Sequence, residues 1–296
     1  MKQITIILIS CFYMMHGFSQ SPEDSTALHP DSAKTTGSSF TVGLVYANNA
    51  NYYGQAAEER IPYAAVAASW RLKSGFYLTG LAYRLLNDPS GAAVSASNFG
   101  AGYNFKMDKH WTADLSYNHT FYPAYSPFLQ ASNPDNASLF IEYDNVLDSK
   151  ITADYAFGKT QDFFVTAGTG KQISLGSIGP KALITFTPAL ELVAGTQHFY
   201  KSYLIEKRLR DSLLGLVLDP IFGNGSSQNQ TPNSVTTATT QFNLISYTLK
   251  CPLAYNRSHY MIEAQYQLSV LSNQAQSGAG KTNSFFSFSF YYQFGS

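Results

Sequence analysis

Apolar and polar residues alternate along successive segments of about ten residues, and this alternation constrains the fold more than any other feature of the chain. In the segment 99–107 the odd positions are apolar and the even positions are Gly, Asn and Lys. In 111–121 the odd positions are again apolar or aromatic, and every even position is polar. Only residues 108–110 separate these segments, which predicts a tight hairpin. A segment of about ten residues is also the length of a tilted strand that spans a membrane.

The same test predicts twelve strands, with a range of ten to fourteen. They are expected at 38–47, 61–73, 75–86, 96–107, 110–122, 137–147, 150–158, 162–175, 180–200, 241–254, 259–271 and 283–294. Long and short connections alternate between them, except that 159–161 is short where a long one is due. This order predicts an all-β fold, a transmembrane antiparallel up-and-down β-barrel with short periplasmic turns and long extracellular loops. An even strand count brings both chain ends to the periplasm.

A soluble β-sandwich is the alternative, because its strands also alternate apolar and polar positions. Only 13% of the residues are charged, and the chain has 21 Tyr and 21 Phe. The apolar faces carry large aromatic residues over their whole length, whereas the opposite faces carry small polar residues with few Lys and Glu. A barrel with lipid outside and a modestly polar lumen explains both faces. The zero net charge gives no reason to expect a nucleic-acid partner.

The first 37 residues differ from the rest of the chain. Lys2 precedes an apolar run that ends near Gln20, so 1–20 is predicted to be a secretory signal peptide. The Ser/Thr/Pro/Asp-rich stretch 21–37 is predicted to be a disordered periplasmic leader. Residues 38–296 would then form the barrel. An alternative for the N-terminus is lipidation of Cys11, because 8–11 matches a bacterial lipoprotein box.

The last predicted strand has aromatic residues at every second position: Phe286, Phe288, Phe290, Tyr292 and Phe294. It resembles the aromatic terminal strand of Gram-negative outer-membrane β-barrel proteins, although Gly295 and Ser296 follow it. The resemblance implies that the barrel-assembly machinery reads this strand. Segments 187–200 and 249–255 and the Ser19-Gln20 ending resemble uncharacterised barrels of Bacteroidota-type bacteria. This likeness assigns no activity.

If the aromatic face points to lipid, the charged residues of the other face line the lumen. The predicted lumen charges are Arg71, Lys73, Arg84, Lys106, Asp114, Glu142, Asp144, Asp154, Glu191 and Glu263. The basic residues fall on strands two to four and Asp114, Glu142, Asp144 and Asp154 on strands five to seven, so a basic wall would oppose an acidic one. Such walls could set up a transverse field in a narrow pore, or could pair and close it. Glu191 and Glu263 are expected to be isolated structural carboxylates.

No nucleophile and base are suitably placed in the sequence for catalysis, so no enzymatic activity is predicted. His119 and His198 continue apolar faces and are expected at the lipid interface rather than in a catalytic site. The histidines do not form a cluster suited to metal ligation, and no cofactor or metal is predicted.

The connection 201–240 has two readings. Residues 203–214 could form an amphipathic helix, or they could continue the preceding strand beyond the membrane; the β propensity of 234–240 favours the strand. Lys207, Arg208 and Arg210 could contact lipopolysaccharide phosphate, although a solvated charged face is the simpler interpretation.

Three functions follow. The first is a passive small-solute channel or a closed structural barrel, between which the sequence does not choose. The second is a surface adhesion or binding protein acting through loops 123–136 and 201–240. The third, a membrane-embedded lipid-modifying enzyme, is disfavoured for want of a nucleophile–base pair. The expected partners are outer-membrane lipid, lipopolysaccharide and the barrel-assembly machinery, and no oligomeric state is predicted.

Overall fold

The computed structural model describes residues 38–88, 92–124, 126–179, 182–208, 210 and 241–294. The predicted signal peptide, the leader, Cys11 and residues 211–240 therefore lie outside the described residues. Within the described part, no helix has the length and hydropathy needed to cross a membrane.

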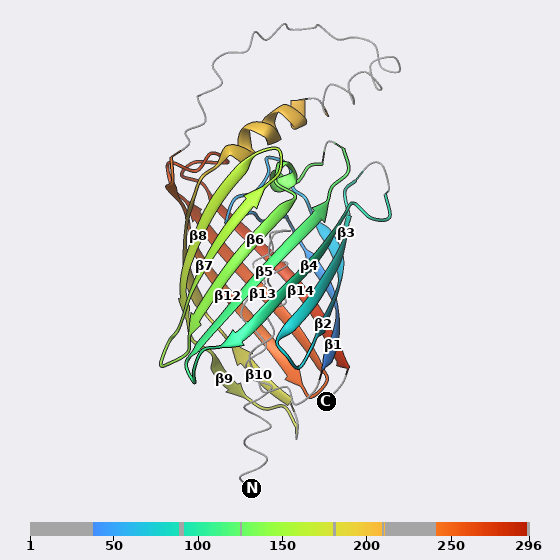
Figure 1. Ribbon diagram of the computed structural model, residues 1–296, viewed down its shortest axis with the longest axis vertical. Helices are drawn as coiled ribbons and strands as arrows, with labels where there is room; N and C mark the ends of the chain where they lie inside the picture. The colour runs from blue at the N-terminus through green and yellow to red at the C-terminus, as the bar shows by residue number, and fades with distance from the viewer. Residues whose placement is uncertain are drawn as a thin grey trace, which may run out of the picture.

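Twelve antiparallel strands close into a barrel (Figure 1). They are β1 (Ser39–Ala47), β2 (Tyr63–Arg71), β3 (Phe76–Leu85), β4 (Ala96–Lys106), β5 (Trp111–Phe121), β6 (Asp135–Tyr143), β7 (Asp148–Phe157), β8 (Gln161–Gly170), β11 (Ala189–Gly195), β12 (Asn243–Arg257), β13 (Tyr260–Leu271) and β14 (Thr282–Phe294). Strands β1 to β8 pair in sequence order, β8 pairs with β11, and β11 pairs with β12. The barrel closes where β14 pairs with β1. The prediction of a twelve-stranded up-and-down barrel is confirmed.

Two further strands, β9 (Ile173–Gly176) and β10 (Ala182–Phe186), lie outside the barrel wall. They prolong the β8–β11 hairpin, and β10 still pairs with the end of β12. The predicted strand 162–175 therefore covers most of both β8 and β9, and 180–200 contains β10, β11 and the start of a helix. Pro188 stands between β10 and β11, where it has no backbone N–H to donate to a ladder.

The two barrel ends differ in their connections. The turns 72–75, 107–110, 144–147 and 258–259 join strands at what we term the short-turn end, where β1 begins and β14 ends. The loops 48–62 and 272–281 and the described parts of 86–95, 122–134 and 196–242 lie at the opposite, long-loop end, together with a helix at 198–208 (Figure 1).

The short connection 158–160, which breaks the alternation in loop length, also lies at the long-loop end. It packs against loop 122–134: the backbone N–H of Lys159 donates to the Ser132 carbonyl oxygen at 2.7 Å. A Cβ at Gly158 would lie 2.3 Å from Cδ of Pro134. The turn is therefore tight because a neighbouring loop covers it.

Large apolar side chains cover the outer surface of the barrel. The exposed fraction reaches 60% for Phe99, 57% for Leu115 and 55% for Leu44, all on the outward positions of their strands. In water such a surface would be unfavourable, whereas hydrocarbon solvates it. A closed antiparallel barrel with an apolar exterior is the architecture of a membrane-spanning β-barrel.

Candidate functional site

The inward positions of the strands carry the charges that define the barrel interior. Of the predicted lumen residues, Arg71, Asp114, Asp154, Glu191 and Glu263 are buried, and Glu142 lies on the same inward face of β6 as buried Ser138. Lys106 and Asp144 keep the inward register but lie at the short-turn end, where Lys106 is exposed.

The predicted basic wall on strands two to four is wrong. Arg84 is exposed and shares the outward face of β3 with Phe76 and Leu78, and Lys73 lies exposed in the turn after β2. The error has a physical cause: β3 carries aromatic residues on both faces, and its tyrosines, Tyr77 and Tyr83, point inward. A tyrosine suits a polar interior because its hydroxyl can hydrogen-bond there.

A three-charge cluster that the sequence reasoning missed lies on the opposite wall. Lys150 Nζ is 2.7 Å from Glu191 Oε1, and Lys250 Nζ is 2.8 Å from Glu191 Oε2. The expectation that Glu191 is isolated is therefore wrong: its carboxylate contacts two lysines and neutralises the charge of one. Lys150 shares its face with Asp154, and Lys250 shares its face with Thr248, so the period-two pattern could have placed both inside.

Gly168 makes this cluster possible. It lies on β8 between Lys150 of β7 and Glu191 of β11, and it pairs with both residues in the ladder. A Cβ at Gly168 would lie 2.9 Å from Lys150 Cε and 3.0 Å from Glu191 Cγ. The missing side chain leaves a notch across which the lysine reaches its partner.

A second notch serves the charges on β2 to β5. The Tyr77 hydroxyl donates to Asp114 Oδ1 at 2.7 Å, although β4 lies between β3 and β5. Gly102 on β4 leaves the room, because a Cβ there would lie 2.3 Å from Tyr77 Cζ. The Arg71 guanidinium lies 5.0 Å from the centre of the Tyr77 ring, within cation–π range.

The interior is divided along the barrel axis. Arg71, Asp114, Glu142, Lys150, Glu191 and Glu263 lie in the half of their strands nearer the short turns, whereas Asp154 lies in the other half of β7. The long-loop half holds two apolar clusters instead. In one cluster Tyr52 of loop 48–62 packs with Leu129 of loop 122–134. The other cluster contains Ile61 and Phe128 of the same two loops.

The helix at 198–208 lies across the long-loop end (Figure 1). Phe199 and Tyr203, one helical turn apart, are buried against Tyr52 and Phe164. This helix corrects the expectation that 203–209 continues the preceding strand, since residues 203–208 are helical.

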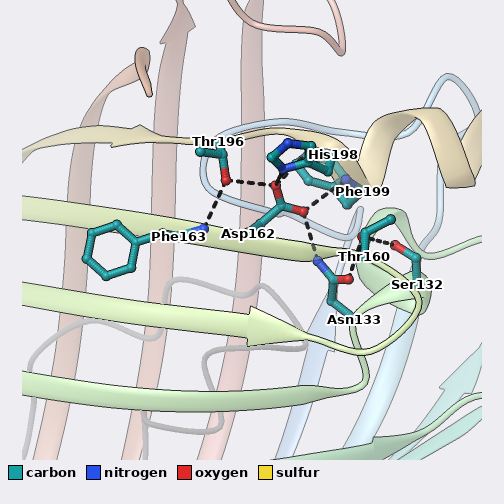
Figure 2. A network of polar contacts seen from close by, with 8 residues as sticks. All are labelled: Ser132, Asn133, Thr160, Asp162, Phe163, Thr196, His198 and Phe199. Atoms are coloured by element: carbon teal, nitrogen blue, oxygen red, sulfur yellow. Dashed lines mark hydrogen bonds and ion pairs between the residues drawn. The ribbon is translucent and has the colours of Figure 1, made fainter. Parts of the chain in front are cut away.

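Asp162 of β8 holds the start of this helix, as Figure 2 shows. Its buried carboxylate accepts hydrogen bonds from the backbone N–H groups of His198 and Phe199 at 2.7 and 2.9 Å. Thr196 Oγ1 and Asn133 Nδ2 donate to it as well, at 2.9 Å each. A carboxylate at the first N–H groups of a helix satisfies donors that have no partner within the helix.

Ion pairs hold the C-terminal end of the helix. Glu206 accepts from Lys159 Nζ at 2.6 Å, and Lys207 pairs with Glu58 of loop 48–62. Arg210 pairs with Glu59 of the same loop, with Nη2 to Oε1 at 3.1 Å. The helix is therefore linked to both the β7–β8 turn and loop 48–62. These ion pairs are partly exposed, so water and salt screen the attraction between their charges.

The histidines do not form a catalytic pair with a hydroxyl nucleophile in the described residues. His198 Nδ1 lies 2.9 Å from Asp162 Oδ1, but the nearby Thr196 hydroxyl donates to the same carboxylate rather than to the imidazole. His198 begins the helix, so its expected place on a lipid-facing strand is wrong. His119 does lie on the outward face of β5, 2.7 Å from Asp135 Oδ1. Across the described ranges, no group of three potential metal ligands occurs.

Loop 123–136 was a candidate for surface binding, but its centre turns inward. Phe128, Leu129 and Gln130 are buried, and Leu129–Ser132 forms the short 3-10 helix η2 beneath the long-loop end. Of the other candidate loop, 201–240, only the helical residues up to 208 and Arg210 are described.

Comparison with known proteins shows likeness of fold. No protein-family model and no curated protein matches the chain. Among solved structures, the KdgM porin is 10% identical with a TM-score of 0.47, covering 86% of this chain and 99% of the porin. An outer-membrane channel from Pseudomonas putida F1 is 11% identical with a TM-score of 0.44, covering 87% and 96%. LpxR from Salmonella typhimurium is 9% identical with a TM-score of 0.42, covering 86% and 99%. At these values the likeness assigns no activity to this chain.

Proposed function

We propose that the protein is a passive channel for small solutes in the outer membrane of a Gram-negative cell, closed at its long-loop end in this structure. The observation that carries the proposal is the charged interior beside glycine notches. A barrel that served only as a membrane anchor would gain more from an apolar interior, because even a paired buried charge often stabilises a protein less than an apolar residue of similar volume. In this arrangement the short-turn end faces the periplasm and the long loops face outward.

The closure lies in the loops and the helix at 198–208. Tyr52, Phe128 and Phe199 pack inside the long-loop half, and the ion pairs of Glu58 and Glu59 link the helix to loop 48–62. Exposed ion pairs contribute little energy each, about 0 to 1 kcal/mol. These two ion pairs are therefore the weakest of the contacts that hold the helix against loop 48–62, and opening would move the helix and the loop without a change in the barrel wall.

Single-channel recording in a planar bilayer tests the proposal. We expect brief openings of the wild-type protein and more frequent openings of Glu58→Gln/Glu59→Gln, which lacks both pairs. Asp108→Asn, in a turn at the opposite end, is the matched control and should behave as the wild type. Absence of conductance in all three proteins would overturn the channel.

A closed structural barrel is the second candidate, and the buried interior of the long-loop half supports it. Under this alternative, the paired charges rigidify the barrel and nothing passes. The conductance experiment separates the two functions directly. We also propose that the barrel-assembly machinery reads β14, whose outward aromatic residues run along the strand that closes the barrel against β1.

A further inference from the structure

A groove crosses the outer surface of the barrel near the long-loop end. It is formed on β14, β1, β2 and β3, which are neighbours in the wall, and its volume is about 520 Å³. The lining includes exposed apolar side chains from β1 and β14, two outward alanines, the loop residues Ala93 and Val94, and Arg84.

The strand register explains why the surface is hollowed there. One row of directly paired outward residues runs Phe288, Tyr46, Ala64 and Arg84, and the next row runs Phe290, Leu44, Val66 and Ala82. Large side chains on β14 and β1 thus give way to alanines on β2 and β3. These alanines line the groove together with the larger side chains, and Ala93 and Val94 of loop 86–95 line it as well.

Arg84 sets the chemistry of this groove. Its side chain is exposed, and no described residue forms an ion pair or a hydrogen bond with it. Among the outward strand positions of the described residues, Lys or Arg occurs only at Arg84 and Arg257. Arg257 ends β12 at the short-turn end, so Arg84 is the outward cation beside the long loops.

We propose that this groove binds the lipid A anchor of lipopolysaccharide, with one acyl chain in the groove and a phosphate on Arg84. The proposal rests on the outer-membrane location given above. An acyl chain fits because an unfilled apolar groove facing lipid loses dispersion contacts along its length. A phosphate fits because the guanidinium can donate two parallel hydrogen bonds to its oxygens. The level of Arg84, one residue before the end of β3, suits a headgroup at the membrane surface.

Native mass spectrometry of the detergent-solubilised barrel, titrated with purified lipid A, tests this site. Arg84→Gln removes the phosphate donor and should weaken binding about tenfold. Ala82→Phe fills the groove and should weaken binding without touching the arginine. The matched controls are Lys73→Gln, an exposed cation at the other end, and Ala68→Phe, an outward alanine of β2 that does not line the groove. Heat-modifiable migration on a gel confirms that each variant forms the barrel.

The site is supported if Arg84→Gln and Ala82→Phe bind lipid A more weakly while both controls bind as the wild type. It is also supported if dephosphorylated lipid A binds weakly and is indifferent to Arg84→Gln. Unchanged binding in both groove variants, or equal loss in the controls, would overturn it. Equal Arg84-dependent binding of phosphatidylglycerol would assign the groove to phospholipid and would also overturn it. A barrel that binds lipid A but does not conduct would refute the channel alone.

Discussion

Lys150 and Glu191 form an ion pair across an intervening strand, with Nζ and Oε1 2.7 Å apart over the bare backbone of Gly168. Lys250 contacts the other oxygen of the same carboxylate. The three side chains are at most 15% exposed. This cluster joins β7, β11 and β12, and it therefore ties together the part of the wall where the β9–β10 hairpin leaves the barrel.

Replacing Glu191 should destabilise the barrel. Glu191→Gln leaves buried Lys250 and the partly buried Lys150 without their shared counter-ion, and breaking a buried ion pair costs about 3–5 kcal/mol. The double variant Glu191→Gln/Lys250→Met also removes the buried charge of Lys250 and should recover part of the loss. Urea unfolding of the reconstituted barrel measures both values. Equal stability of the wild type and Glu191→Gln would contradict the role of the cluster.

Gly168→Ala should also destabilise the barrel, by about 1–3 kcal/mol, because the added methyl overpacks the notch. Gly80→Ala is the matched control: a Cβ at Gly80 would lie 3.6 Å from Phe99 Cε1, which is an ordinary contact. The same unfolding measurement compares the two variants. A larger loss of stability in Gly80→Ala than in Gly168→Ala would contradict the role of the notch at Gly168.

The barrel itself was predictable because apolar outward residues and polar inward residues alternate along the whole length of a membrane-spanning strand. Each of the twelve predicted segments overlaps one barrel strand, since a slip by one residue would turn its aromatic residues into the lumen. The alternation fails at β3, where aromatic residues occupy both faces and Arg84 was assigned to the wrong one. Hydrophobicity alone cannot distinguish a tyrosine facing lipid from one that donates to Asp114.

The paired charges and the helix were harder to predict because their partners are distant in sequence. Lys150, Glu191 and Lys250 meet only after β8 brings a glycine between the first two. The helix at 198–208 depends on Asp162, which lies 36 residues before His198. Local β propensity could not reveal that distant carboxylate, so the strand extension was preferred.

Asp162→Ala should loosen the helix, because it removes the acceptor for the backbone N–H groups of His198 and Phe199. Loss of such a cap costs about 0.5–2 kcal/mol, and here the side-chain donors of buried Asn133 and partly buried Thr196 lose their partner as well. Limited trypsin digestion should cleave faster after exposed Lys201. Ser132→Ala, which removes only a 3.4 Å contact with Thr160 Oγ1, is the control. Equal cleavage rates in the two variants would show that Asp162 does not hold the helix.

The β4–β5 turn should lose stability at acidic pH. The backbone N–H groups of His110 and Trp111 donate to Asp108 Oδ1 and lower the pKa of this exposed carboxyl below its usual range. A group whose pKa is depressed by folding stabilises the fold above its unfolded pKa of about 3.9, and this contribution is lost as the pH falls through the folded value. The stability difference between the wild type and Asp108→Ala should therefore be present at neutral pH and shrink below about pH 4. A difference that does not change with pH would contradict this.

Leu115→Arg tests the membrane-facing band at its centre. Leu115 lies midway along β5 and is 57% exposed on the outward face, so an arginine there would enter hydrocarbon at a cost of about 2–4 kcal/mol. Phe121→Arg places the same charge at the end of that face, near the long loops, where the cost should fall to about 0–1 kcal/mol. Unfolding from lipid vesicles should therefore rank Leu115→Arg well below Phe121→Arg in stability. The ranking should disappear in a detergent that lets the arginine reach water, because depth in a bilayer is then no longer what separates the two positions.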